Sequence, residues 1–281
     1  MREYKDNGQG ARPAKQWGKK PNRSDYANGR GKPRQEEDEG RDLIIEGKNA
    51  VWEALENGRE IDKILFASGS HKSVGHIIAK ARELGITAQE TDKHKLDKLS
   101  DTDAHQGIIA MCAAAAYSTM EDILALAKVR GEVPLIILCD GITDPHNLGA
   151  IIRSAEVAGA HGVVIPKRRS AGLNGACAKA AAGALEYVPV AKCGNLQQAI
   201  AFLKEHGVFA FAADMGGDSM YGVDMRLPAA IVIGAEGSGI SKAVKENCDF
   251  VVSIPQKGKI QSLNASNAAA VLLYEALRQR G

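Results

Sequence analysis

The chain has 281 residues, of which 44% are hydrophobic and 25% are charged, a composition typical of a globular protein with room for two domains. The sequence contains no run of about 18 apolar residues, and its polar N-terminus lacks an apolar signal segment. We therefore expect no membrane span and a cytoplasmic location. Its five cysteines are odd in number and show no C-x-x-C spacing, which argues against a disulfide framework or a metal site.

The charge is concentrated at the N-terminus. Residues 1–34 carry ten basic and three acidic side chains, a net charge of +7, and the remaining 247 residues sum to −5. Residues 1–41 lack hydrophobic periodicity, so we predict a disordered basic tail. Tyr4, Trp17 and Tyr26 lie among its basic residues, a pattern that fits phosphate contacts and stacking on bases. A tail that only keeps the protein in solution fits this composition equally well.

A small α/β domain is predicted for residues 42–113. Apolar residues at helical spacing indicate helices over residues 50–55 and 74–84, and short apolar runs indicate strands at 63–67, 86–88 and 107–111. Residues 114–132 are predicted to be a linker that contains one short helix.

A second domain is predicted for residues 133–281. Its strands are expected at residues 135–138, 163–165, 208–212, 230–233 and 250–254, and each is apolar throughout. Continuous apolar strands separated by helical stretches indicate a parallel sheet that is buried on both faces. Since ligands of such sheets bind at the carboxyl ends of the strands, we expect the chemistry in this domain.

The first of three segments suited to chemistry, residues 140–156, leads from a strand end into a helix. Arg153 lies about 140° around this helix from Leu148 of the buried stripe. Gly149 and Ala150, one turn earlier, are expected to leave open space in front of the Arg153 guanidinium. A permanently charged, planar guanidinium over such a surface suits a phosphate or a ribose. Two simpler interpretations stay open: an ion pair of Arg153 with Glu156, and Asn147 as the N-cap of the helix.

The second segment, residues 231–240, places three glycines after a strand. Glycines there permit close approach of the backbone to a ligand. The spacing is G-x-x-G-x-G rather than the G-x-G-x-x-G of dinucleotide folds, so by itself it is weak evidence. Glu236 in this loop disfavours a phosphate but is compatible with a cationic sulfonium cofactor. A position near a helix N-terminus, where an acid is favourable, would also explain it.

The third segment, residues 254–266, precedes a long C-terminal helix. Ser262, Asn264 and Ser266 are residue types that begin helices well, so capping explains them. Three polar side chains around the apolar Leu263 also suit an adenine or a methionine moiety. The spacing does not separate these two interpretations.

Together the three segments resemble the SpoU family of the knotted SPOUT methyltransferases. The matching motifs are N-L-G-x-x-x-R at 147–153, G-A-E-G at 234–237 and S-L-N-x-S at 262–266. The first domain, with E-G at 46–47 and H-Q-G-I-I-A at 105–110, is similar to the L30e-like substrate-binding domain of that family. The resemblance covers about residues 42–281.

Finer motifs within these segments point to one branch of the family. D-P-H-N at 144–147 and P-K-R-R-S at 166–170 resemble the bacterial enzymes that methylate a guanosine ribose in the peptidyl-transferase P loop of 23S ribosomal RNA. Gln256 and Ala265 stand where Met and Val are frequent in the family, and neither change removes a polar group.

The resemblance implies an α/β fold with a C-terminal trefoil knot, S-adenosylmethionine as cofactor and large-subunit ribosomal RNA as substrate. It also implies a homodimer with active sites near the subunit interface, and neither a metal nor a membrane partner. The residues implied to hold the cofactor are Gly234, Ala235, Gly237, Ile254 and Leu263, and those implied to act in catalysis are Asn147, Arg153, Glu236, Ser262 and Asn264.

An arginine is essentially never deprotonated in a protein. We therefore expect Arg153 to clamp the adjacent phosphate and stabilise developing negative charge rather than to act as a base. Two other functions compete with this hypothesis: a 2′-O-ribose methyltransferase acting on transfer RNA, and a catalytically silent RNA-binding assembly factor. The residues that argue against the silent factor, because all are intact, are Asn147, Arg153, Glu236 and Asn264. A nucleotide-dependent oxidoreductase would need a different glycine spacing.

Overall fold

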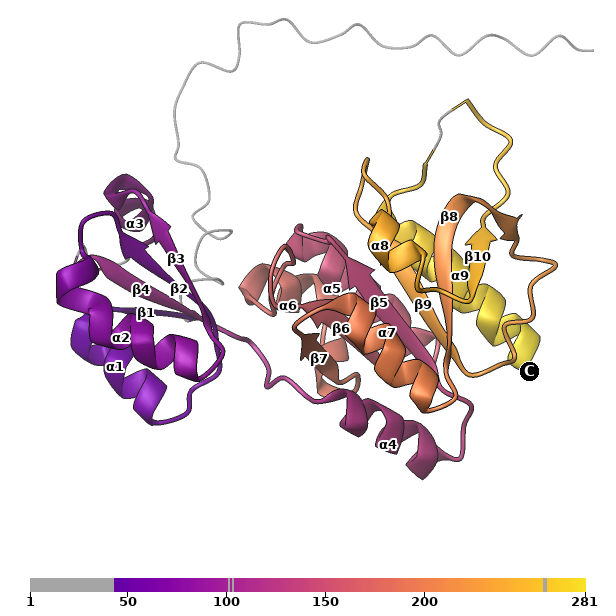
Figure 1. Cartoon of the computed structure of the whole chain (residues 1–281), viewed down its shortest axis with the longest axis horizontal. Helices are drawn as coiled ribbons and strands as arrows, with labels where there is room; N and C mark the ends of the chain where they lie inside the picture. Colours follow the sequence, from indigo (N-terminus) through magenta and orange to yellow (C-terminus); the bar gives the residue numbers. More distant parts are fainter. Residues whose placement is uncertain (1–42, 101, 103, 260–261) are drawn as a thin grey trace, which may run out of the picture. The chain divides into compact units, whose positions relative to one another are not determined.

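The computed structural model describes residues 43–100, 102, 104–259 and 262–281 (Figure 1). This part of the chain forms a four-stranded sheet followed in sequence by a six-stranded sheet, each covered by helices. The predicted tail, residues 1–41, lies outside the described residues. Within the described ranges, no helix is both long and apolar enough to cross a bilayer.

The first sheet is mixed. Its strands, in spatial order, are β1 (Ile44–Glu46), β4 (Ile108–Cys112), β2 (Ile61–Ala67) and β3 (Thr87–Thr91). β4 runs antiparallel to both of its neighbours, whereas β2 and β3 are parallel. Helices α1 (Lys48–Glu56) and α2 (His71–Glu83) bury their apolar stripes against one face, and α3 (Lys93–Leu99) covers the other.

The helices and strands predicted for this region are confirmed, with bounds that differ by up to three residues. β1 and α3 were not predicted, and both have a physical reason for being missed. β1 has only three residues, which is too short for a periodic pattern. α3 buries a single side chain, Leu96, so it has no apolar stripe that a sequence could display.

The second sheet is parallel throughout. Its strands, in spatial order, are β10 (Phe250–Ser253), β8 (Phe209–Ser219), β9 (Ala229–Gly234), β5 (Leu135–Asp140), β6 (Gly162–Pro166) and β7 (Val190–Cys193). The predicted parallel sheet and its five predicted strands are therefore confirmed. β7 was missed because Lys192 interrupts its short apolar run.

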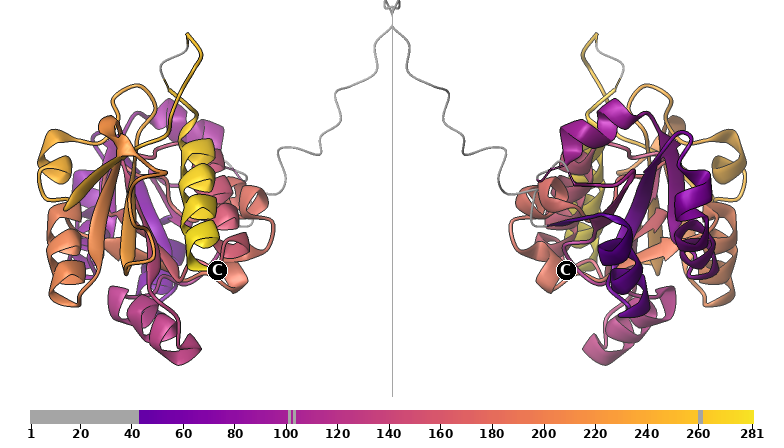
Figure 2. Two further views of the ribbon diagram at one scale, coloured as in Figure 1. Left: turned by 90° about the vertical axis from the view of Figure 1, so that its right-hand side faces the viewer. Right: turned by 90° about the vertical axis from the view of Figure 1, so that its left-hand side faces the viewer.

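Helices cover both faces of this sheet, which explains why its strands are apolar throughout. α4 (Met120–Arg130), α7 (Leu196–Glu205) and α8 (Lys242–Lys245) pack on one face. α5 (Pro145–Val157), α6 (Gly175–Ala181), the 3₁₀ helix η2 (Ala184–Glu186) and α9 (Ala265–Arg280) pack on the other. Figure 2 shows α9 in yellow and α7 in orange on opposite sides of the strands.

The order of the strands fixes where a ligand can enter. From β5 the chain builds outward through β6 and β7, and it then crosses to the other side of β5 to add β8, β9 and β10. The order therefore reverses between β5 and β9, which are neighbours. Connections on either side of such a reversal diverge, and this leaves a crevice at the carboxyl ends of the two strands.

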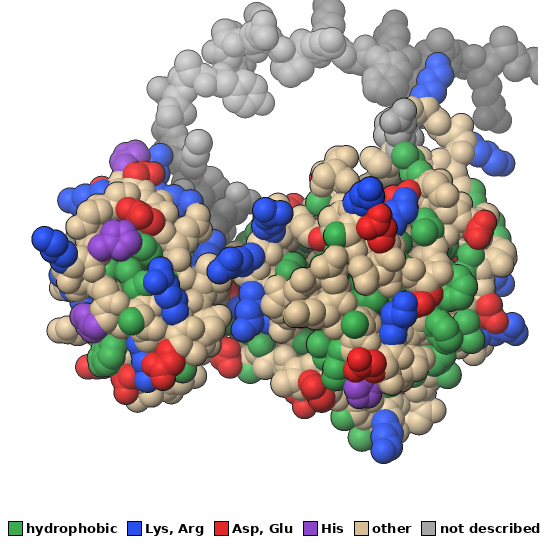
Figure 3. All heavy atoms as spheres, viewed as in Figure 1, with side chains coloured by type: hydrophobic (Ala, Val, Ile, Leu, Met, Phe, Trp, Pro, Cys, Tyr) green, Lys and Arg blue, Asp and Glu red, His purple; other side chains and the backbone are tan. Residues whose placement is uncertain are grey.

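The face of the described residues that Figure 3 draws carries no extended region of one charge. Figure 3 shows basic side chains interspersed with acidic and uncharged ones over the face viewed. On this face a polyanion would therefore meet local groups of basic side chains rather than a continuous basic surface.

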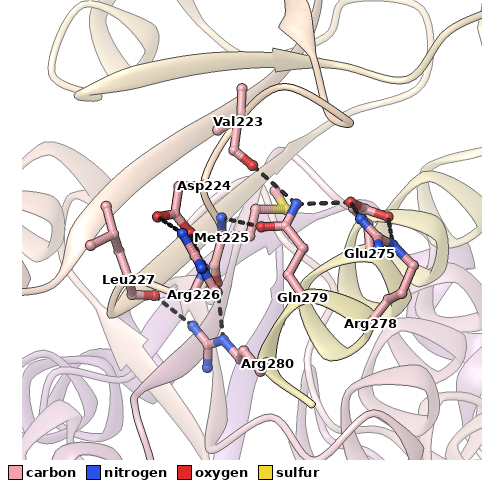
Figure 4. Close-up of polar contacts among 9 residues, drawn as sticks. All are labelled: Val223, Asp224, Met225, Arg226, Leu227, Glu275, Arg278, Gln279 and Arg280. Carbon is pink, nitrogen blue, oxygen red and sulfur yellow. Dashed lines mark hydrogen bonds and ion pairs between the residues drawn. The ribbon is translucent and has the colours of Figure 1, made fainter.

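A polar network holds the C-terminal end of α9 (Figure 4). The Arg280 guanidinium donates hydrogen bonds of 2.6–3.1 Å to the main-chain carbonyls of Met225, Leu227, Val133 and Pro134. Burial without a carboxylate partner lowers the pKa of Arg280. Because the donors reach the segments that lead into β5 and β9, they fix α9 relative to the two strands that flank the crevice.

All five cysteines are free thiols, and four of them are buried, as small apolar side chains would be. Burial raises the pKa of Cys139 and of Cys177 to about 12, so neither is a thiolate at neutral pH.

The trefoil knot implied by the family resemblance stays a prediction.

Candidate active site

The three segments singled out in the sequence meet at the crevice between β5 and β9. Asp140 and Gly234, the last residues of these strands, are partners in the sheet register. The first segment continues from β5 into α5, and the second continues from β9 into the β9–α8 loop (residues 235–241). The third leads from the end of β10 to the beginning of α9. The predicted convergence of the three strand ends is therefore present.

Three side chains, one from each segment, form a hydrogen-bonded cluster, which we call the amide–carboxylate cluster. Asn147 donates from Nδ2 to Oε1 of Glu236 over 3.1 Å. Asn264 donates from Nδ2 to Oδ1 of Asn147 over 2.9 Å and also to Oε1 of Glu236. These contacts join residues 89 and 117 positions apart in the sequence. One carboxylate oxygen thus accepts from two amides, and Asn147 both donates and accepts.

Two helices begin at this cluster. Asn264 is the N-cap of α9, and its Oδ1 accepts from the backbone N–H groups of Ser266 and Asn267. Asn147 lies in the first turn of α5. The N-terminal end of a helix carries a partial positive charge, so both helices stabilise a negative Glu236. The capping interpretation and the site interpretation of Asn264 therefore both hold.

Asn147 is not an N-cap. Asp144 occupies that position, and its side chain accepts from the backbone N–H of His146. Pro145 follows at the first helical position, where its missing N–H leaves no hydrogen bond unmade. With capping assigned to Asp144, the Asn147 amide is available to Glu236.

The β9–α8 loop turns back tightly on the end of β9. A Cβ atom on Gly234 would lie 2.2 Å from the backbone carbon of Gly239 and 2.3 Å from the nitrogen of Ile240, so only glycine fits there. Ala235 and Gly239 exchange two backbone hydrogen bonds, and the Ser241 N–H donates to Asp140 over 2.7 Å. The end of β5 therefore holds the loop against the sheet.

A cavity of about 300 Å³ lies beside the amide–carboxylate cluster. The residues predicted to hold the cofactor all line it, namely Gly234, Ala235, Gly237, Ile254 and Leu263, as do Glu236 and Ser262. Its volume lies at the small end of the range for small-molecule sites, about 300–1,000 Å³. The position of these side chains fits the predicted roles, which themselves remain proposals.

Several lining residues were not among the predicted site residues, and Asp214, Met215 and Gln256 are three of them. Asp214 follows the predicted strand at 208–212, so the rule that ligands bind at strand ends would have found it. Hydrogen bonds from the Gly216 N–H and from the Lys245 ammonium lower the pKa of Asp214, which is therefore ionised at neutral pH. Together with Glu236 it gives the cavity two carboxylates, of which Asp214 is paired with the Lys245 ammonium over 3.0 Å, so Glu236 is the stronger attraction for a cationic ligand.

Arg153 lies apart from the cluster and does not line the cavity. It is exposed on α5, six residues beyond Asn147 and thus about 9 Å further along the helix axis. Within the described part of the chain its guanidinium forms no ion pair or hydrogen bond, so the alternative pairing with Glu156 is not formed. The expected position away from the core is confirmed.

The interpretation of Gly149 was wrong. Rather than leaving space beside Arg153, this glycine is buried where α5 crosses α6. A Cβ atom there would lie 2.4 Å from the carbonyl oxygen of Cys177 and 2.6 Å from the Cβ of Ala180. Gly149 therefore serves the close packing of two helices, and the open surface around Arg153 does not depend on it.

Comparison with known proteins decides the family. The model described as "SpoU rRNA Methylase family" matches residues 134–274. The chain belongs to the SpoU rRNA methylase family. A second model, "RNA 2'-O ribose methyltransferase substrate binding", matches residues 44–118. The chain is thus an RNA 2′-O-ribose methyltransferase with the two-part organisation that its two sheets display.

Relatives and a solved structure agree with this membership. A protein of Bacillus subtilis strain 168 named as a TrmH family tRNA/rRNA methyltransferase, YacO, is 42% identical over 241 residues, which are 85% of this chain and 96% of that protein. A Staphylococcus haemolyticus protein named for the same family is 41% identical over 242 residues, covering 85% and 96%. The SpoU methyltransferase AviRb from Streptomyces viridochromogenes, solved with the cofactor AdoMet, is 27% identical with a TM-score of 0.54, covering 84% of this chain and 90% of that one.

Proposed function

We propose that this SpoU-family enzyme transfers a methyl group from S-adenosylmethionine to the ribose 2′-oxygen of a guanosine in the peptidyl-transferase P loop of 23S ribosomal RNA. The observation that carries the proposal is the amide–carboxylate cluster of Asn147, Glu236 and Asn264 beside a cavity with two carboxylates. The motifs at 144–147 and 166–170 support the choice of ribosomal RNA.

The enzyme depends on S-adenosylmethionine, and the cavity fits this cofactor. When bound, the cofactor supplies an electrophilic methyl group on a cationic sulfonium. Glu236 offers a charge that complements such a cation, and Asp214, paired with Lys245, adds a second carboxylate to the lining. Ile254 and Leu263 offer apolar contacts, and Gly234 lets the backbone approach a ligand closely.

The residues of the chain have to position the ribose and assist the loss of its proton. Holding a nucleophile in line with an electrophile can itself supply a large part of such a barrier. Asn147 and Asn264 fix the carboxylate of Glu236, and Ser262 adds a hydroxyl at the cavity. Arg153, which is permanently charged, would clamp the neighbouring phosphate and stabilise the charge that develops on the 2′-oxygen.

The domain boundaries given above, residues 42–113, 114–132 and 133–281, are part of the proposal, with the first domain binding RNA and the second transferring the methyl group. We further propose a homodimer in the cytoplasm. Val157, Tyr274 and Leu277 of α5 and α9 are exposed by 57%, 50% and 42%, and they would be covered in a dimer. Val157 follows Arg153 by four residues on the same face of α5, which would place Arg153 near the subunit interface.

The test uses S-adenosylmethionine labelled in its methyl group. The full chain is incubated with unmodified 23S ribosomal RNA and, separately, with unmodified transfer RNA, and the label is mapped by nuclease digestion and mass spectrometry. The expected product is one 2′-O-methylguanosine in the P loop. Label on transfer RNA alone would overturn the choice of ribosomal RNA and make transfer RNA, which the names of the relatives also include, the substrate. Label on neither would overturn the function.

The role of Arg153 is tested with Arg153→Ala. We expect the rate of methyl transfer to fall by about two orders of magnitude or more, the size found when a charge-stabilising donor is removed, with unchanged cofactor affinity. A rate near that of the wild type would refute the role.

A further inference from the structure

A second hollow, which we call the β5–β7 groove, lies beyond the β9–α8 loop from the cofactor cavity. Its volume is about 610 Å³, roughly twice that of the cavity. It lies at the carboxyl ends of β5, β6 and β7 and includes the N-terminal residues of α7. Ala235, Ser238 and Gly239 line both hollows. The β9–α8 loop is therefore a shared wall between the two.

The charge of the groove comes mainly from two arginines. Arg168 and Arg169 follow the end of β6, line the groove and are exposed. Within the described ranges neither guanidinium makes an ion pair or a hydrogen bond. Arg169 has φ of +57°, a left-handed conformation that side chains other than glycine and asparagine rarely adopt. The one acid of the groove, Asp140, already accepts a hydrogen bond from the Ser241 N–H.

Two other polar side chains of the groove, Asn195 and Gln197, are engaged in hydrogen bonds with the protein itself. Asn195 is the N-cap of α7 and accepts from the backbone N–H of Gln197. Gln197 in turn donates to the carbonyl of Ala243 over 3.2 Å. Since these two side chains are engaged in tying α7 to α8, the charged donors that the groove leaves unused are those of the two arginines, beside the neutral hydroxyls of Thr143, Ser238 and Ser241.

Small-molecule sites are mostly apolar and enclose their ligand. The β5–β7 groove instead presents two unpaired guanidiniums and the N-terminal end of a ten-residue helix, both of which favour anionic oxygens. It also adjoins the place where the reacting ribose would lie. These features fit a phosphodiester backbone that continues from the nucleotide at the cavity.

We propose that the β5–β7 groove binds the RNA strand adjacent to the methylated nucleotide, with Arg168 and Arg169 contacting successive phosphates. The inference rests on the proposed function of the same site. It assigns the two arginines to substrate positioning, with the β9–α8 loop separating the cofactor from the flanking strand.

The experiment compares Arg168→Gln/Arg169→Asn in the full chain with the wild type. Asparagine tolerates the left-handed conformation at position 169, so the backbone is not strained further. The control Lys128→Gln/Arg130→Gln removes the same charge from exposed positions of α4, near the amino end of β5. Affinity for an unmodified 23S ribosomal RNA transcript is measured at salt concentrations from about 50 to about 200 mM, and S-adenosylmethionine affinity is measured by calorimetry.

Each phosphate contact to a single strand contributes about 0.7 to the slope of log affinity against log salt concentration. We expect the groove variant to lower the magnitude of the slope by about 1.4, the control to leave it unchanged, and both to bind the cofactor as the wild type does. Arg168→Lys/Arg169→Lys should restore most of the slope, because each lysine remains a point charge for phosphate.

The outcomes separate the two claims. If the wild type methylates RNA but the groove variant keeps the wild-type slope, or loses no more slope than the control, the inference is overturned. If the wild type transfers no methyl group to either RNA, the proposed function fails. A variant that loses slope but is not rescued by lysine would also contradict phosphate binding at this groove.

Discussion

Replacing Asn264 by aspartate separates the two roles that the structure gives this side chain. Its Oδ1 caps α9 by accepting from the backbone N–H groups of Ser266 and Asn267. Its Nδ2 donates to Asn147 and Glu236 in the amide–carboxylate cluster. Asn264→Asp keeps an oxygen for the cap but replaces the donating Nδ2 by an oxygen, so that a second carboxylate faces Glu236. Asn264→Ser keeps the cap and merely removes the donor.

The expected cost follows from these contacts. Two hydrogen bonds are lost, and one of them goes to a charged oxygen, for which about 1.5–3 kcal/mol is typical. Two like charges about 4 Å apart repel by about 1 kcal/mol in water and by about 4 kcal/mol at an effective dielectric constant of about 20. Because Glu236 is exposed and the acid gains from the dipole of α9, the lower part of that range applies. We expect Asn264→Ser to destabilise this domain by about 2–3 kcal/mol, and Asn264→Asp by about 1 kcal/mol more because of the repulsion.

Thermal unfolding followed by circular dichroism at pH 8 and pH 5 measures the difference. A shift of about 2–4 °C in Tm is expected per kcal/mol for a chain of this size. The facing carboxylates raise one another's pKa, so the folded state binds more protons than the unfolded state. Stability of Asn264→Asp should therefore recover as pH falls towards 5, whereas that of Asn264→Ser should not. Adding Glu236→Gln should abolish the difference between the two variants. Equal Tm values for both variants at pH 8 would refute the convergence of these side chains.

Three further predictions follow from other parts of the structure. Gly234→Ala would place a Cβ atom 2.2 Å from the backbone of the β9–α8 loop. The affinity for S-adenosylmethionine, measured by calorimetry, should therefore fall about tenfold or more. Gly75→Ala, at a position with open space around the Cβ, should leave this affinity unchanged. His161 is buried and neutral, and burial lowers its pKa below 6.5. Its contribution to stability is therefore complete above pH 6.5 and is lost as pH falls below that value. Between about pH 7 and pH 5.5 the Tm should drop in the wild type, and it should drop less in His161→Gln. Arg280→Ala removes four hydrogen bonds to main-chain carbonyls and should lower the free energy of unfolding in urea by about 2–4 kcal/mol. Arg226→Ala, which removes an exposed ion pair, should have a much smaller effect, and similar losses for the two variants would contradict the anchoring of α9.

Much of the fold could be predicted because the second sheet is buried on both faces. β5 and β9 consist of apolar residues almost from end to end, and no helix-forming or turn-forming pattern competes with them. The missed elements lack such a signal. Lys192 interrupts β7, and α3 presents only Leu96 to the interior. The reversal of strand order between β5 and β9 depends on contacts distant in sequence, which local patterns do not contain.

The site was predictable to the extent that its residues lie at strand ends. Glu236 and Asn264 could be named from their segments, but their shared hydrogen bond joins positions 28 residues apart and appears only in the folded chain. Gly149 shows the converse limit. Its place one helical turn before Arg153 suggested a role at the site. In the structure, the close packing of α5 on α6 is what requires a glycine at this position. A glycine in a helix looks the same in sequence whichever neighbour it accommodates.

The central claim is that one pocket at the carboxyl ends of β5, β9 and β10 brings a methyl donor to the amide–carboxylate cluster. A crystal structure of the full chain grown with S-adenosylmethionine tests it directly. The account predicts electron density for the cofactor in the cavity lined by Gly234, Ile254 and Leu263, with its methyl group turned towards the side of Asn147 and Glu236. Density for the cofactor at any other place on the chain, with this cavity filled by water, would contradict it.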